Sequence, residues 1–316
     1  MNGEEADICF TSPPYAQQRD YKTGPQDWDA LMQGVFSILP VKLGAQVLVN
    51  LGLVHHDGEW APYWTPWIEW MRSAGWRRFG WYVWDKGPGL PGDWNGRLAP
   101  SHEFIFHFNR TAVRARKTKD KLPESIKVMG GGIRRGAMRR KDGTMAARSN
   151  RAAGLQPTKI PDSVIRVLRI NVGDNAGGTG HPAPFPVALV TEVLTAFCDA
   201  GAVCFEPFSG SGTQIVSAEE NSRQCCAMEI SPAYVDASVK RWSKFTGRSA
   251  MLADDGRTFD EVSAAREGGM TTEVECTCPE CGAEFSAKPE GGHRLLCGDS
   301  TVATDEPGDW LSPSWP

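Results

Sequence analysis

The chain has 316 residues, 41% of them hydrophobic and 23% charged, which suits a globular core and excludes fibrous and wholly disordered classes. No run of about eighteen apolar residues occurs, and the start, Met1 to Glu5, is acidic where a secretory signal is basic and then apolar. We therefore expect a cytoplasmic protein that does not contact a membrane. Nine cysteines without such a signal predict reduced thiols or a metal site rather than a disulfide framework.

The net charge of −4 is unevenly distributed. A basic segment, residues 110–151, carries 14 Lys and Arg against 3 Asp and Glu, whereas the rest of the chain carries 20 against 35. Clustered cations neutralise phosphates and release counterions, so this segment points to a polyanion partner. The alternative is a solvated loop without a partner. The residues we expect to contact the polyanion are Arg134, Arg135, Arg139, Arg140 and Lys141.

Hydrophobic patterns along the chain predict alternating strands and helices. The expected strands are residues 6–10, 45–51, 79–84, 104–108, 202–208 and 225–230. The expected helices are residues 28–39, 64–71, 187–197, 213 onward and 232–245. Strands that alternate with helices predict an α/β fold with a doubly wound, mixed sheet. The basic segment interrupts this alternation.

Eight of the twelve tryptophans lie between Trp60 and Trp94. They are candidates for stacking on bases, but their helical spacing and the neighbouring strands favour packing in the core. We therefore predict a core role for them.

One predicted strand runs into a Gly-x-Gly turn at the start of a helix, Val203 to Thr213. Glycines there allow close approach of a ligand to the backbone at the carboxyl end of a strand, where open α/β sheets bind cofactors. Glu229 ends the next strand, seventeen residues beyond Gly212, in a position to accept hydrogen bonds from both hydroxyls of a ribose. The alternative is a tight turn followed by an ordinary surface glutamate.

The first predicted strand ends at Ser12-Pro13-Pro14-Tyr15. Two prolines fix a rigid turn and remove two backbone donors, which leaves carbonyls and the Ser12 hydroxyl as outward acceptors. An exocyclic amine needs such acceptors to hold its protons while its lone pair turns toward an electrophile. Tyr15 is placed to stack on a flipped base. The alternative is a Pro-Pro turn with a packing tyrosine.

Together, Ser12 to Tyr15, Phe205 to Thr213, Glu229 and His181 to Pro186 resemble S-adenosylmethionine-dependent DNA amino-methyltransferases, in the order of that family's beta arrangement. The resemblance spans about residues 6–265. It implies a Rossmann-like methyltransferase sheet within domain 1–265, in which residues 109–155 form the target-recognition insertion. It further implies S-adenosylmethionine as cofactor and double-stranded DNA as partner, and it allows a cognate restriction enzyme as a second partner.

Carried over by motif, the resemblance implies that Ser12, Pro13, Pro14 and Tyr15 hold the reacting base, and that Glu229 binds the ribose. The residues that it implies around the rest of the cofactor are Phe205, Glu206, Phe208, Gly210, Gly212 and Thr213, with His181 and Pro182 capping the pocket. No Pro-Cys dipeptide occurs, which disfavours methylation of cytosine C5 through a cysteine nucleophile. The leading serine favours cytosine N4 over adenine N6. A catalytically inactive DNA-binding module and methylation of RNA are the alternatives.

The chain departs from the family at its start, because only ten residues precede Thr11, where members often carry a strand that ends in Gly-Asp-Ser. A similar segment, His293 to Thr301, lies far along the chain. Either the end of the chain folds back to supply that strand, or residues 253–256 contact the adenine, or the chain is a fragment. The sequence leaves all three open.

Beyond a linker at residues 266–275, a cysteine-rich tail spans residues 276–316. Cys278 and Cys281 have the spacing of a zinc knuckle, which His293 and Cys297 complete to four ligands. A structural zinc would supply folding energy that a short segment lacks. The alternatives are ordinary reduced thiols and a returning sheet strand.

Overall fold

A computed structural model describes residues 3–15, 28–120, 137–147, 158–169, 186–253 and 255–267, together with two strands at 284–286 and 294–297. The chain divides into a larger unit, Met1–Arg114 with Asp162–Pro316, and a smaller unit, Ala115–Pro161. The two units are described separately.

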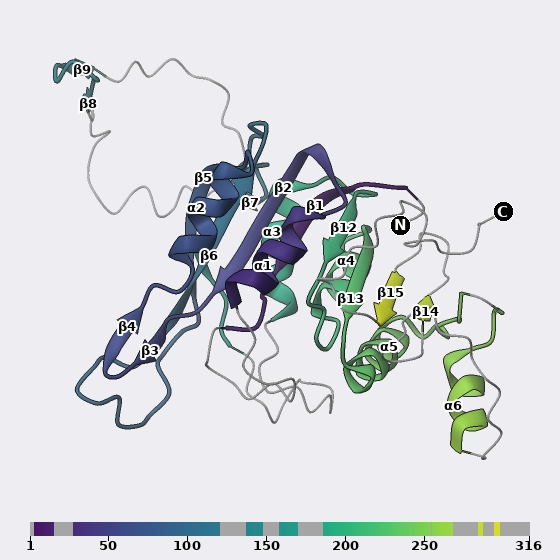
Figure 1. The fold of residues 1–316 in the computed structure, drawn as a ribbon. Coiled ribbons are helices and arrows are strands. Elements are labelled where there is room, and N and C mark those ends of the chain that lie inside the picture. The colour runs from purple at the N-terminus through teal and green to yellow at the C-terminus, as the bar shows by residue number, and fades with distance from the viewer. Residues whose placement is uncertain are drawn as a thin grey trace. The chain divides into compact units, whose positions relative to one another are not determined.

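The larger unit is built on one nine-stranded sheet in the order β11-β5-β6-β2-β1-β12-β13-β15-β14 (Figure 1). Its strands are β1 (Ala6–Thr11), β2 (Val41–Leu51), β5 (Arg77–Asp85), β6 (His102–Asn109), β11 (Val164–Arg166), β12 (Val203–Glu206), β13 (Gln224–Glu229), β14 (Glu284–Ser286) and β15 (Arg294–Cys297). Five neighbouring pairs are parallel and three are antiparallel. The prediction of a mixed α/β sheet is confirmed.

Helices cover both faces of this sheet. They are α1 (Trp28–Ser37), α2 (Thr65–Ser73), α3 (Val187–Phe197), α4 (Thr213–Glu220), α5 (Pro232–Thr246) and α6 (Phe259–Glu267). On one face, Ile8 and Leu48 pack with side chains of α3, α4 and α5. On the other, Val47 and Val49 pack with α1 and α2. Alternate residues of one strand therefore face two separate cores, as a doubly wound sheet requires.

Local sequence signals account for the ends of several elements. α5 begins at Pro232, whose fixed φ suits a first helical turn, and ends at Gly247 with φ 70°. The sequence did not predict the hairpin of β3 (Val54–His56) and β4 (Glu59–Ala61). Its Asp57-Gly58 turn has φ of 49° and 84°, the left-handed pair that favours tight hairpins.

The tryptophans divide between core and surface. Trp64, Trp67, Trp76 and Trp84 are buried, as predicted. Trp60 and Trp81 expose 60% and 62% of their surface, so a core role for these two was wrong. Trp81 lies on β5 and contacts two phenylalanines of β6, Phe104 edge-on and Phe106 at a tilt of 34°.

The smaller unit contains two short antiparallel strand pairs, one of which is a hairpin within the basic segment. One pairs β7 (Lys119–Asp120) with β10 (Thr158–Lys159), and the other is the hairpin of β8 (Ala137–Arg139) and β9 (Met145–Ala147). Arg140 and Lys141 lie at the exposed turn of this hairpin. Within the described ranges, every helix is too short or too polar to cross a membrane.

Replacing Trp67 with alanine tests the core on the α1 and α2 face. The indole is fully buried and touches Trp28, Phe36 and Phe108, so Trp67→Ala should lower the free energy of unfolding by about 3–5 kcal/mol. Trp81→Ala is the matched control and should cost less than about 1 kcal/mol. Urea unfolding measures both, and equal losses would contradict the assignment of this core.

Candidate functional site

The sequence motifs meet at one edge of the sheet. β1, β2, β12 and β13 run parallel, so their carboxyl ends at Thr11, Leu51, Glu206 and Glu229 lie along the same edge. β6 runs antiparallel to β2, with Phe104 opposite Leu51. The amino end of β6 therefore contributes side chains to this edge as well.

The glycine turn between β12 and α4 has a conformation that larger residues resist. Gly210 and Gly212 have φ of 55° and 73°, and a Cβ on Gly212 would lie 2.8 Å from the Cβ of Ser238 on α5. Ser238 Oγ also donates to the carbonyl of Gly210 at 2.9 Å. Arg241 Nη1, further along α5, donates to Thr213 Oγ1 at 2.9 Å. The turn is thus clamped against α5.

Glu229 ties this turn to the next strand. Its Oε2 accepts a hydrogen bond from the Gly210 N–H at 2.7 Å, and its Oε1 accepts one from the Ser231 N–H at 2.9 Å. Burial raises the pKa of Glu229, and the backbone donors at Ser231 and Gly210 oppose that rise. Each carboxylate oxygen keeps a second lone pair, so further donors can still bind. The predicted ribose contact stays a prediction.

Glu206, at the end of β12, is 1% exposed. Its Oε1 accepts hydrogen bonds from Thr11 Oγ1 and from the Phe208 N–H at 2.9 Å. Burial raises the pKa of Glu206 to about 8. The two hydrogen bonds lower this pKa in part, and the nearby charge of Glu229 raises it further. This carboxyl group links the end of β1, where the Ser12–Tyr15 turn begins, to the glycine turn after β12.

The Ser12–Tyr15 turn follows β1, and two of its groups already make contacts within the protein. The carbonyl of Pro14 accepts a hydrogen bond from Trp28 Nε1 at 2.8 Å, so this carbonyl, expected as an outward acceptor, already holds an internal donor. The ring of Tyr15 lies on Gly52, where a Cβ would come within 2.7 Å of Tyr15 Cε2. Ser12 is half-buried at the same edge.

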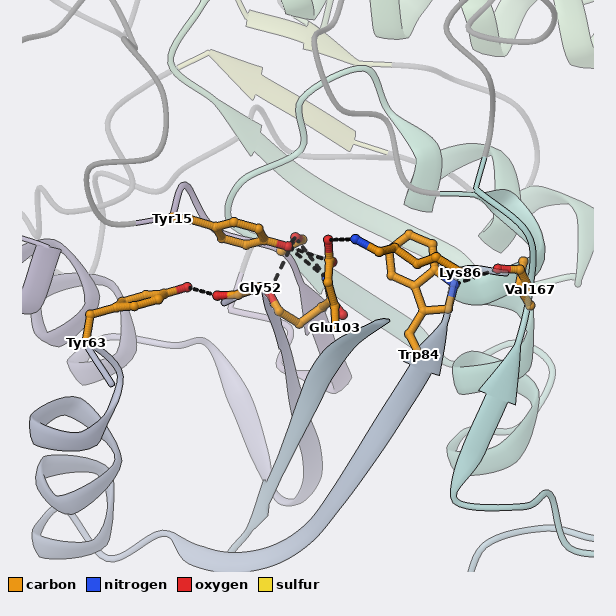
Figure 2. Close-up of polar contacts among 9 residues, drawn as sticks. Tyr15, Gly52, Tyr63, Trp84, Lys86, Glu103 and Val167 are labelled. Carbon is orange, nitrogen blue, oxygen red and sulfur yellow. Dashed lines mark hydrogen bonds and ion pairs between the residues drawn. The ribbon is translucent and has the colours of Figure 1, made fainter. Parts of the chain in front are cut away.

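Three residues that the sequence did not single out complete this part of the edge: Asn50 on β2, Lys86 after β5 and Glu103 on β6 (Figure 2). Tyr15 Oη donates to Glu103 Oε2 at 2.7 Å, and Asn50 Nδ2 donates to the same oxygen at 2.6 Å. Lys86 Nζ pairs with Glu103 Oε1 at 2.8 Å. We call these three residues, with Ser12 and Tyr15, the Glu103 cluster.

The other predicted site residues lie in the core, in the smaller unit or outside the described residues. Phe205 is buried in the core on the α1 and α2 face, and Phe208 is packed against that core. Arg139 ends β8. Seven candidates, namely Arg134, Arg135, His181, Pro182, Cys278, Cys281 and His293, lie outside the described residues. Across the described ranges, no group of three or more His, Cys, Asp or Glu side chains is placed to hold a metal ion, so the predicted zinc gains no support.

The tail supplies a strand beside the site. β15 pairs in parallel with β13, and Cys297 stands opposite Glu229. This is the arrangement in which the end of the chain folds back into the sheet. The alternative adenine contact was residues 253–256. There Asp255 Oδ2 accepts a hydrogen bond from Arg257 Nε at 2.6 Å, and Asp254 lies outside the described residues. The domain boundaries stay predictions.

Comparisons with known proteins agree on one family. A family model described as DNA methylase, of the N6/N4 methyltransferase kind, matches residues 6–240. The type II methyltransferase M.Cfr9I of Citrobacter freundii is 27% identical over 187 residues, and the match covers 55% of this chain and 49% of that protein. M.XycI of Xanthomonas campestris pv. cyanopsidis is 26% identical with the same coverage. The chain therefore spans about half the length of these curated relatives.

Among solved structures, a PvuII DNA methyltransferase described as cytosine-N4-specific aligns with a TM-score of 0.54. Its sequence identity is 19%, and the alignment covers 77% of this chain and 84% of that one. The likeness shows a shared fold.

The raised pKa of Glu206 predicts a pH-dependent stability. Between pH 4.5 and about 8 the folded state holds a proton that the unfolded state releases. The stability that this proton contributes is fully present below the pKa of the carboxyl group in the unfolded state. It is lost as the pH rises through the pKa in the folded state, by no more than about 1.4 kcal/mol per pH unit. Glu206→Gln stays neutral and should flatten the fall in unfolding free energy between about pH 5.5 and 8.

Urea unfolding at several pH values makes the measurement, with Glu220→Gln on the exposed end of α4 as the control. A slope in Glu206→Gln equal to that of the wild type would show that this carboxyl group is not the one that titrates.

Proposed function

Because the chain belongs to the DNA methylase family of the N6/N4 kind, we propose that it transfers a methyl group from S-adenosylmethionine to an exocyclic amino group of a DNA base. The observation that carries this proposal is the hydrogen bond from Thr11 to Glu206, which joins the catalytic turn to the cofactor turn. Cytosine N4 is the preferred acceptor in this proposal. The serine that leads the motif supports this choice, as does the cytosine-N4 specificity named for the PvuII structure.

The residues present fit this cofactor. Ser209 Oγ, in the glycine turn, is buried and has no hydrogen-bond partner among the described residues. Gly210 and Gly212 carry no side chain, so a ligand can approach the backbone closely there. In this proposal Glu229 holds the ribose, and the turn from Glu206 to Thr213 holds the methionine part. When bound, the cofactor supplies an electrophilic methyl group.

At the other half of the edge, Ser12 and Tyr15 hold the base. Ser12 Oγ accepts a proton of the amino group, which lets the nitrogen lone pair leave the plane of the ring. The target base reaches the site after flipping out of the duplex. No covalent bond to the enzyme is needed, in keeping with the absence of a Pro-Cys dipeptide from the sequence.

Double-stranded DNA is the proposed partner of the basic segment. The hairpin of β8 and β9 presents Arg140 and Lys141 at an exposed turn, where phosphates can reach them. A cognate restriction enzyme stays an optional partner, since the relatives include both type II and orphan methyltransferases.

The proposed chemistry is tested by transfer of label from methyl-labelled S-adenosylmethionine to DNA. Ser12→Ala should lower turnover by about 10²-fold or more and leave cofactor affinity unchanged, because its contact is with the reacting base. Glu229→Ala should instead weaken cofactor binding by about 1–3 kcal/mol in calorimetric titration. Glu220→Ala, on the exposed end of α4, is the control for both.

DNA binding without label transfer in the wild type would reject the enzyme and favour an inactive binding module. Full turnover in Ser12→Ala would remove the catalytic role of the serine, and unchanged affinity in Glu229→Ala would remove the ribose contact.

The role of the basic segment is tested by the salt dependence of DNA binding. Replacing Arg134, Arg135, Arg139, Arg140 and Lys141 with glutamine should reduce the slope of log K against log salt by up to about 4.5, since each phosphate contact contributes about 0.9. Arg72→Gln with Lys244→Gln, two exposed cations on α2 and α5, should leave the slope unchanged. An unchanged slope in the fivefold variant would place the DNA surface elsewhere.

A further inference from the structure

A shielded carboxylate lies beside the Ser12–Tyr15 turn, and no sequence motif accounts for it. The side chains of Glu103 and Lys86 expose only 14% and 18% of their surface. They come from neighbouring strand ends, since Glu103 stands opposite Trp84 in the pairing of β5 with β6. An ion pair this shielded loses little strength to solvent. Lys86 therefore fixes the position of the Glu103 side chain at this edge.

The hydrogen bonds of the Glu103 cluster converge on that carboxylate. Figure 2 shows Tyr15 and Lys86 approaching Glu103 from opposite sides. Oε2 accepts from Tyr15 Oη at 2.7 Å and from Asn50 Nδ2 at 2.6 Å, and Oε1 accepts from Lys86 Nζ at 2.8 Å. An ionised carboxylate has acceptors only. Glu103 thus accepts from Tyr15, Asn50 and Lys86, while Asn50 Nδ2 also lies 3.1 Å from Tyr15 Oη.

The direction of the hydrogen bonds between Glu103 and Ser12 follows from the number of protons that each hydroxyl group carries. Tyr15 has one hydroxyl proton, and it is donated to Glu103. In the contact of 3.4 Å between Ser12 Oγ and Tyr15 Oη, Ser12 is therefore the side that can donate. The carbonyl of Asn50, also 3.4 Å from Ser12 Oγ, is the other acceptor within reach of that proton. Ser12 Oγ also accepts from Asn50 Nδ2 at 3.4 Å, which leaves one lone pair for an amino N–H. The contact is long for two hydroxyl groups, and such links tighten when a substrate binds.

Methylation of an amine leaves a proton to be removed. The nitrogen lone pair forms the new N–C bond, the electron pair of the broken C–S bond stays with sulfur, and the nitrogen is left with one proton too many. Along these hydrogen bonds, the proton of the base passes to Ser12 Oγ, the Ser12 proton passes to Tyr15 Oη, and the Tyr15 proton passes to Glu103 Oε2. Both hydroxyl groups are restored, and the net change is one proton moved from the base to the carboxylate.

We propose that Glu103, held by Lys86 and Asn50, is the proton acceptor of the reaction and acts through Tyr15 and Ser12. This inference rests on the proposed function. The same carboxylate stabilises the positive charge that develops on the amino nitrogen, because a fixed charge in a shielded site needs no reorganisation. Glu103 does not touch the base in this account. Its competing role is to hold Tyr15 in place by a hydrogen bond alone.

Two conservative variants separate the relay from mere positioning. Glu103→Gln keeps the shape and one acceptor oxygen but takes up no proton, and Tyr15→Phe keeps the ring on Gly52 but breaks the chain. In single-turnover assays with the full chain, each should slow methyl transfer by about 10²-fold. The double variant should be no slower than the slower single variant, because both changes interrupt one path. Glu103→Asp should recover part of the rate.

The pH profile is the readout that positioning alone does not move. The wild-type rate should fall toward acid pH as the relay's acceptor becomes protonated, and Glu103→Gln should lose this acid limb. Cofactor affinity should match the wild type in both single variants. Glu103→Gln should lower the free energy of unfolding, because Lys86 loses its shielded partner, so rates are compared under conditions where both variants are folded. Glu69→Gln, which alters an exposed ion pair with Arg78 on the outer part of the sheet, is the control and should keep both rate and profile.

Three outcomes would overturn the relay while leaving the methyltransferase intact. They are a wild-type rate in Glu103→Gln, an acid limb that persists in that variant, and a double variant whose loss equals the product of the two single losses. A wild-type chain that transfers no methyl group to any DNA would instead reject the proposed function, and the relay with it.

Discussion

The hydrogen bond between Thr11 and Glu206 is the constraint on which the candidate site depends. Both side chains are buried, with 0% and 1% exposure, and they stand at the ends of adjacent parallel strands, β1 and β12. β1 continues directly into the Ser12–Tyr15 turn and β12 into the glycine turn, so the contact sets the separation of these two turns. Burying a carboxyl group is costly. Here the hydrogen bonds from Thr11 and Phe208 offset part of that cost.

The other half of the site depends on strands of both directions. The parallel strands bring their carboxyl ends to the edge, whereas antiparallel β6 brings its amino end, where Glu103 lies. This reversal places a carboxylate within 2.7 Å of the Tyr15 hydroxyl. A wholly parallel sheet would present only carboxyl ends at the same edge, so the mixed topology is what positions the Glu103 cluster.

Sequence reasoning succeeded where the physical cause was local. Periodicity located the main helices and strands, and turn chemistry located Ser12 and Gly212. It failed where the cause was tertiary: Lys86 and Glu103 meet only because β5 pairs with β6 in one register, and no spacing in the sequence encodes that register. Trp81 was misjudged for a related reason, because its burial depends on which face of β5 a helix covers. The Asp57-Gly58 dipeptide is a local signal for a tight hairpin, so the hairpin of β3 and β4 was predictable from the sequence.

The most direct test of the account is the chemical identity of the methylated base. DNA incubated with the full chain and S-adenosylmethionine would be digested to nucleosides and analysed by mass spectrometry, with the Ser12→Ala chain as the background. The account predicts N4-methylcytosine that depends on Ser12. N6-methyladenine would keep the amino-group chemistry and reject the preference for cytosine. C5-methylcytosine, or no methylated nucleoside above the Ser12→Ala background, would contradict the central claim.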